Sequence, residues 1–267
     1  MFKLNKQTKN KTKTKNKNNT HTAIMITGQL RVFSDIENDF FNMIKCIEQY
    51  TNVVLFFYVS DKTKIAEFHR QIYATRNNIS LEESALREKN LYPTSFSTHD
   101  FHQRSKKRKL PYVYRSYDSA MFDNQFNDCH YSLKSSRIQV YLEKTCLEDV
   151  FSYEKLKKMK FDSFLRIRPD YLLNNTGLQY VQKYYSNMNC CLTHWNFFYL
   201  YPRKYLNMHL VHRSQILDHI HFYCDKYNIT SGDLIDCSFK FALIEHGINC
   251  ISASLGNVYP VIGRFGK

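Results

Sequence analysis

The sequence contains no run of about eighteen apolar residues, the length that a membrane-spanning helix requires. Its N-terminus lacks the apolar core of a secretory signal. The eight cysteines show no C-x-x-C spacing, which excludes paired zinc-ligand clusters and favours free thiols in a reducing cytosol. Neither G-x-G-x-x-G nor G-K-[ST] occurs, so neither a dinucleotide fingerprint nor a P-loop is indicated. We therefore expect a cytoplasmic protein without a membrane anchor.

The two most basic segments of the chain contain no acidic residue. Residues 1–22 hold seven lysines and no acid, and residues 104–109 hold five more basic residues, whereas the net charge of the whole chain is +14. The remainder is therefore close to neutral. A nucleic-acid-binding protein would be supported only by these two segments, and we do not expect a nucleic-acid partner. We expect residues 1–22 to be a disordered, solvated tail and residues 104–109 to be an exposed loop.

The full sequence is 43% hydrophobic, and the part after residue 22 is long enough for one large domain. Short apolar runs alternate with helical patterns, which predicts a three-layer α/β (Rossmann-like) domain with a mostly parallel sheet over residues 23–267. The expected strands span residues 22–27, 53–59, 161–170, 190–194, 197–200, 248–252 and 258–262, and the expected helices span residues 35–50, 64–75, 119–150, 153–159, 178–185, 202–223 and 231–246.

The segment Phe161–Asp170 (FDSFLRIRPD) is an expected strand with charge at its carboxyl end. Side chains alternate along a strand, so Arg166 and Arg168 share one face and Asp170 is expected to continue it. Ligands of open α/β sheets bind at this edge, where guanidinium groups suit phosphate and a carboxylate suits a divalent metal or a sugar hydroxyl. An internal Arg–Asp salt bridge explains the same residues, and both interpretations stay open here.

Several segments occur in a recognisable order. They are Gly28-Gln29-Leu30-Arg31 after the first strand, Arg-Ile-Arg-Pro-Asp (166–170), an aromatic segment followed by Pro202-Arg203, Gly247-Ile248 after the last helix, and Val-Tyr-Pro-Val-Ile-Gly-Arg (258–264). This order resembles a family of GT-A-like glycosyltransferases of large DNA viruses and bacteria, with G-Q-x-R near the start and R-x-R-P-D in the middle. The likeness spans roughly residues 23–264. It implies a compact GT-A-like domain with a nucleotide-binding α/β half and, for a viral protein, the host cytoplasm.

The resemblance also implies roles at the donor site. Asp170 takes the place of the metal-binding carboxylate of a D-x-D element, which would hold Mn²⁺ or Mg²⁺. The sequence departs from that element because residue 168 is arginine. Arg31, Arg166 and Arg168 are then expected to neutralise the donor diphosphate instead. Gly28 and Gln29 would line the nucleotide pocket, although a glycine at this place can serve the turn alone.

An inverting transferase needs a carboxylate base to deprotonate the acceptor hydroxyl. Asp233, at the start of the last expected helix, is the candidate, with Asp236 and Glu245 as further ones. An aspartate in a first helical turn also serves as a cap or dipole partner. Trp195 and the aromatic residues after it suit stacking on a sugar ring, although such runs are commonly core. The histidines at 209 and 212 have i, i+3 spacing, for which we expect packing and surface roles.

These observations predict a soluble glycosyltransferase that moves a sugar from a nucleotide-sugar donor to a hydroxyl of a glycan or glycoprotein acceptor. The alternative is a non-catalytic nucleotide- or carbohydrate-binding module of the same fold, which would lack an acidic group near the donor's anomeric carbon.

Overall fold

A computed structural model describes residues 20–30, 33–60, 74–75, 78–83, 86, 109–122, 131–186, 190–252 and 254–258. Arg31, residues 1–19, nearly all of the expected helix 64–75 and residues 104–108 lie outside the described residues. The predictions made for them therefore stay predictions.

Seven strands form one sheet with the order β3-β2-β1-β4-β7-β6-β8, and two short strands form a second sheet. The large sheet contains β1 (His21–Gln29), β2 (Asn52–Ser60), β3 (Tyr112–Ser116), β4 (Ser163–Ile167), β6 (Cys191–His194), β7 (Phe198–Pro202) and β8 (Cys250–Ser252), and the small sheet contains β5 (Tyr171–Leu173) and β9 (Gly256–Val258). Strands β3, β2, β1 and β4 are parallel, whereas β7 is antiparallel to both of its neighbours. The predicted α/β class with a mostly parallel sheet is confirmed.

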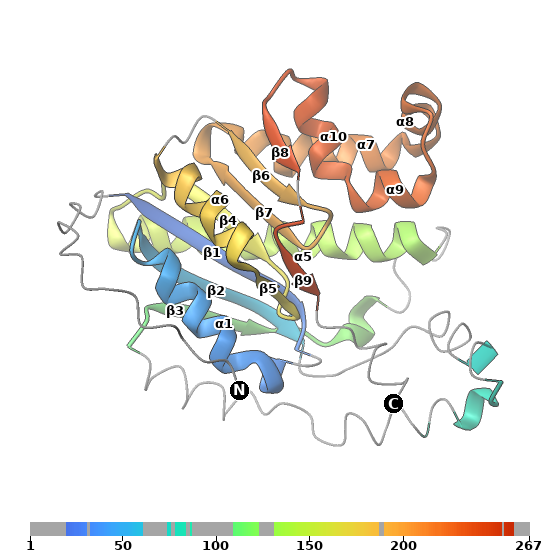
Figure 1. The fold of residues 1–267 in the computed structure, drawn as a ribbon, viewed down its shortest axis with the longest axis horizontal. Coiled ribbons are helices and arrows are strands. Elements are labelled where there is room, and N and C mark those ends of the chain that lie inside the picture. The colour runs from blue at the N-terminus through green and yellow to red at the C-terminus, as the bar shows by residue number, and fades with distance from the viewer. Residues whose placement is uncertain are drawn as a thin grey trace.

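Helices cover both faces of the large sheet, which gives three layers (Figure 1). The α-helices whose bounds the structure gives are α1 (Phe33–Ile47), α5 (Tyr131–Lys157), α6 (Asn175–Ser186), α7 (Arg213–Asp218), α8 (Ile220–Tyr227), α9 (Ser231–Asp236) and α10 (Ser238–Glu245). Helices α1 and α6 pack on the face that contains Leu165 and Ile167 of β4. Helices α5 and α10 pack on the opposite face, beside Phe164. The alternation predicted for β4 is therefore confirmed, and it directs Arg166 towards α5.

Several predicted boundaries are wrong. Helix α5 continues to Lys157, so the expected short helix at 153–159 is its last part. Pro202 ends β7, where it pairs with Ser163, and is also the N-cap of the 3-10 helix Arg203–Tyr205, so the predicted helix start is confirmed, whereas the expected helix is divided into several segments that reach Tyr227. The expected helix 231–246 is interrupted at Cys237, between α9 and α10. Strand β5, directly after Asp170, was not expected; its partner β9 lies more than eighty residues further on and gives no local signal.

The order of the strands reverses at β1. The chain passes from β1 through α1 to β2 and onward to β3, and α5 then returns it to β4 on the other side of β1. Because α1 and α5 cover opposite faces, β1 and β4 form a topological switch point. Open α/β sheets bind ligands outside the carboxyl ends of the strands at such a point.

Candidate functional site

Gly28, from the segment after β1, and Pro169, from the R-x-R-P-D segment, meet at this switch point. In the parallel register Ile26 of β1 faces Ile167 of β4, so Gly28 lies beside Pro169. Gly28 has φ +131°, a conformation that side chains rarely adopt, and a Cβ at this position would lie 3.4 Å from Pro169 Cδ. A larger residue would be strained here. Glycine is therefore favoured by the backbone conformation of this turn, which lies beside the R-x-R-P-D segment.

Arg168 and Asp170 form a bidentate ion pair just beyond the carboxyl end of β4. Arg168 Nε lies 2.8 Å from Asp170 Oδ1, and Nη2 lies 2.5 Å from Oδ2. Asp170 is nearly buried in a turn, whereas 26% of the Arg168 side chain is exposed. The guanidinium also lies over the Phe197 ring, 4.9 Å from its centroid. The internal salt bridge considered above is therefore present, and the Arg168 side chain is partly exposed to solvent.

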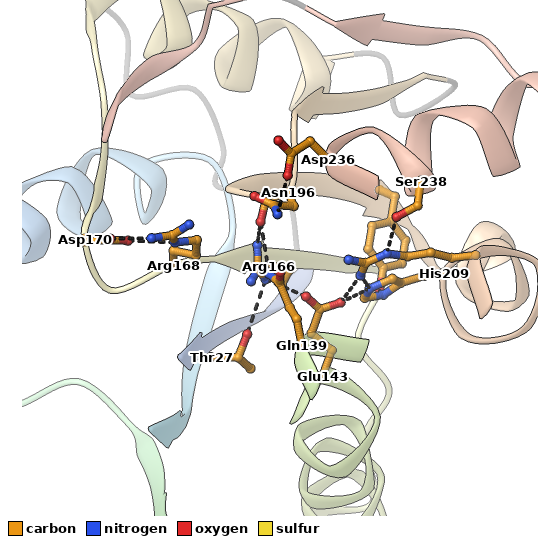
Figure 2. Close-up of polar contacts among 12 residues, drawn as sticks. Thr27, Gln139, Glu143, Arg166, Arg168, Asp170, Asn196, His209, Asp236 and Ser238 are labelled. Atoms are coloured by element: carbon orange, nitrogen blue, oxygen red, sulfur yellow. Dashed lines mark hydrogen bonds and ion pairs between the residues drawn. The ribbon is translucent and has the colours of Figure 1, made fainter. Parts of the chain in front are cut away.

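Arg166 is held inside the protein between β1, α5 and the turn that joins β6 to β7 (Figure 2). Its side chain is 1% exposed, and Nε lies 2.8 Å from Glu143 Oε1. The guanidinium donates hydrogen bonds to Thr27 Oγ1, at 3.3 Å, and to the carbonyl of Asn196. These contacts make Arg166 a positioning residue that fixes the β6–β7 turn from beneath.

A buried polar network continues from Arg166 along α5, and its centre, Glu143, was not predicted from the sequence. Glu143 accepts hydrogen bonds from Arg213 and from His209 Nε2, the latter at 2.5 Å. The Tyr201 hydroxyl lies 2.5 Å from His209 Nδ1. Glu143 lies in line with the apolar residues of α5. A charged residue at such a position requires a buried partner, and this is the signal in the sequence that could have revealed the network.

The charges of this network are strongly perturbed. Burial alone would raise the pKa of Glu143, but Arg213 and Arg166 outweigh it and hold the pKa at about 2. Burial lowers the pKa of His209 below its ordinary value, against the opposing effect of Glu143. A neutral His209 then donates from Nε2 and accepts from Tyr201. Two guanidinium groups share one carboxylate, so this part of the interior carries a net positive charge.

Asp236, at the end of α9, reaches the same turn from the other side. Asn196 Nδ2 donates a hydrogen bond of 3.0 Å to Asp236 Oδ1. Burial raises the pKa of Asp236, with Asp233 adding to the rise and Arg168 opposing it. We call Arg166, Arg168, Asp170, Asn196 and Asp236 the switch-point cluster.

The other candidate carboxylates have different surroundings. Asp233 is exposed in the first turn of α9, where its N–H and its Oδ2 both bond to the hydroxyl of Thr230, the N-cap residue. It lines a pocket of about 570 Å³ with residues of α8 and of the loop before α9. Glu245 is paired with Lys226 and Tyr227. The capping alternative considered for Asp233 is therefore the arrangement seen, and Asp236 is the carboxylate of this helix beside the turn.

The remaining predicted donor residues are only partly placed. Gln29 is half-buried at the end of β1, next to Gly28, and Arg31 lies outside the described residues. Within the described ranges no group of three or more His, Cys, Asp or Glu residues is arranged to hold a metal ion. Asp170 contributes a single carboxylate that is already paired with Arg168. These donors do not by themselves form a metal site, and we derive no step through a metal.

Acid should destabilise this protein through the buried network. When the pKa of a group is lower in the folded protein than in the unfolded chain, the unfolded chain binds the proton at a higher pH. The free energy of unfolding therefore decreases as the pH falls. We expect the loss to begin below pH 6.5 through His209 and to deepen below pH 4.5, towards about 2, through Glu143. The raised pKa of Asp236 opposes this trend at low pH. Urea unfolding midpoints at pH 7, 5.5 and 4 test the expectation, and a midpoint that stays constant contradicts it.

No protein-family model matches this chain, and no curated protein matches it. Among the helices that the structure describes, none is both long and apolar enough to cross a bilayer. The fold and the switch-point cluster thus define an α/β protein with charged side chains at the edge where such sheets bind ligands.

Proposed function

We propose that this protein is a glycosyltransferase that moves a sugar from a nucleotide-sugar donor to a hydroxyl of a glycan or glycoprotein acceptor. The observation that supports it most strongly is the position of Gly28 beside Pro169, with Arg168 and Asp170 adjacent, at the topological switch point. Gly28 of the G-Q-x-R segment and Pro169 of the R-x-R-P-D segment, the two segments that carry the resemblance to GT-A-like transferases, are distant in sequence and adjacent in space. That proximity is what a shared donor site requires.

In this proposal the donor diphosphate binds to the guanidinium of the partly exposed Arg168 side chain. A guanidinium fork can bond two phosphate oxygens at once, as it now bonds the two oxygens of Asp170. When the diphosphate takes over part of that fork, Asp170 gains acceptor capacity for a hydroxyl of the donor sugar. Gly28 allows close approach of the backbone after β1. Metal use remains a prediction.

Asp236 replaces Asp233 as the proposed base. A raised pKa brings a carboxylate closer to the pH at which it accepts a proton efficiently. In an inverting transfer Asp236 takes the proton of the acceptor hydroxyl while that oxygen bonds to the anomeric carbon. The bond from this carbon to the phosphate oxygen breaks, and the nucleoside diphosphate leaves with the electron pair. Arg168 stabilises the charge that develops on it.

Release of nucleoside diphosphate tests the proposal. The full chain is incubated with a panel of nucleotide sugars and a mixture of saccharide acceptors, with and without Mn²⁺. We expect one donor to be turned over, and Asp170→Asn to abolish turnover while the melting temperature changes little. Asp225→Asn, an exposed aspartate of α8, is the matched control and should retain activity.

Two outcomes would contradict the proposal. No release from any donor would favour the non-catalytic binding module of the same fold. A large drop in melting temperature for Asp170→Asn would instead give the ion pair with Arg168 a purely structural role.

A further inference from the structure

The only tryptophan of the chain occupies an unfavourable backbone conformation at the β6–β7 turn. Trp195 has φ +46°, in the left-handed region, where bulky side chains are outliers. Its side chain nevertheless reaches solvent, because the residue is 52% exposed. An aromatic residue that is both strained and exposed contributes little to the stability of the fold. Phe222, exposed on the regular helix α8, shows no such strain.

The turn is fixed from several sides, so the strain is not released by movement. The Asn196 carbonyl accepts from Arg166 and, at 3.1 Å, from Gln139 of α5. Its side chain bonds to Asp236. The residue before Trp195, His194, is bonded at Nδ1 to the hydroxyl of Tyr171, at 2.6 Å. Figure 2 shows these contacts of Asn196 converging from α5, β4 and the C-terminal helices.

The indole also packs beside Phe197, an aromatic residue that contacts Arg168 of the switch-point cluster. The Trp195 and Phe197 rings have centroids 5.8 Å apart and an interplanar angle of 34°. The guanidinium of Arg168 lies over the same Phe197 ring. Trp195 is therefore connected to the proposed diphosphate-binding arginine through Phe197 and to the proposed base through Asn196.

We infer that Trp195 is the platform on which a sugar ring of the acceptor stacks, so that the acceptor is a saccharide. This inference rests on the proposed function. The face of an indole is electron-rich and attracts the weakly positive C–H groups on one face of a pyranose. Carbohydrate sites combine such an apolar surface with a few polar groups that orient the ligand. Asn196, the residue after Trp195, and Asp236, which is bonded to the Asn196 side chain, provide these groups for the ring hydroxyls.

Because Trp195 is the only tryptophan, its fluorescence reports on this one position. The full chain is titrated with lactose, cellobiose, N,N′-diacetylchitobiose and α-1,2-mannobiose at millimolar concentrations. We expect a saturable change in emission with at least one disaccharide. Trp195→Phe, which keeps a stacking ring, should bind that disaccharide in calorimetry, whereas Trp195→Asn should bind it about tenfold more weakly or worse. Phe222→Ala is the control and should match the original chain.

Stability provides a second, independent readout. Asparagine adopts the left-handed region more readily than tryptophan, so Trp195→Asn should keep or raise the melting temperature while it loses saccharide affinity. A lower melting temperature would overturn the inference, since it would make Trp195 a structural residue. A flat fluorescence response to all four disaccharides, or equal affinity of Trp195→Asn, would overturn it as well.

The nucleotide experiment separates this inference from the proposed function. Donor turnover without saccharide binding at Trp195 would overturn the inference and leave the transferase proposal standing. Saccharide binding without turnover of any donor would overturn the transferase proposal and leave a carbohydrate-binding protein.

Discussion

Glu143→Gln is expected to lower the free energy of unfolding by about 3–5 kcal/mol, the usual cost of removing one partner from a buried ion pair. The buried guanidinium groups of Arg166 and Arg213 both depend on this carboxylate, and His209 donates to it. Glutamine retains the shape and one acceptor oxygen but no charge. The two guanidinium groups would then lie in the core, and none of the described residues that face them would provide a contacting anion.

Glu148→Gln is the matched control for this prediction. Glu148 lies on the same helix, α5, but is exposed, so its substitution should change the free energy of unfolding by less than about 0.5 kcal/mol. Urea unfolding of both variants is the measurement. A loss of less than about 1 kcal/mol for Glu143→Gln would mean that the two guanidinium groups do not need the carboxylate. Failure of Glu143→Gln alone to yield soluble protein counts as the expected result.

Asp236→Asn should reduce sugar transfer by about 10²–10⁴-fold, the usual contribution of a general base. Asparagine can still accept the hydrogen bond from Asn196 Nδ2, so the melting temperature should stay close to that of the original chain. Steady-state rates at saturating donor and acceptor give the effect on kcat directly.

Asp233→Asn separates the two aspartates of α9. Its carboxylate is exposed and serves the N-terminal turn of the helix, so we expect full activity with a small loss of stability. The opposite result, with Asp233→Asn inactive and Asp236→Asn active, would return the base to the position that the sequence alone suggested. It would also leave Asp236 with a purely structural role in the switch-point cluster.

The sequence predicted the centre of this strand correctly because alternation along β4 is a local property, but β4 ends at Ile167 and Arg168 is not part of it. It could not predict what each guanidinium contacts. Arg166 is buried because Glu143 faces it from α5, and no spacing rule connects a helix to a strand that follows a loop. Arg168, two residues later, remains partly exposed because the strand has ended. The R-x-R-P-D segment thus contains one buried positioning residue, Arg166, and one partly exposed residue, Arg168.

The choice between Asp233 and Asp236 depended on tertiary contacts in the same way. Both precede the interruption at Cys237, and both are acids on one short helix. Only the β6–β7 turn, which brings Asn196 to Asp236, distinguishes them. The antiparallel direction of β7 was equally hidden, since an apolar run shows burial and not direction.

Binding of nucleoside diphosphates to the full chain tests the central claim most directly. Calorimetry with UDP, GDP, ADP and CDP, with and without Mn²⁺, is compared for the original chain and Arg168→Lys. We expect one diphosphate to bind and to raise the melting temperature, and Arg168→Lys to weaken it by about tenfold because lysine lacks the bidentate fork. Absence of binding by all four, or unchanged affinity of Arg168→Lys, would contradict a donor site at the carboxyl ends of β1 and β4.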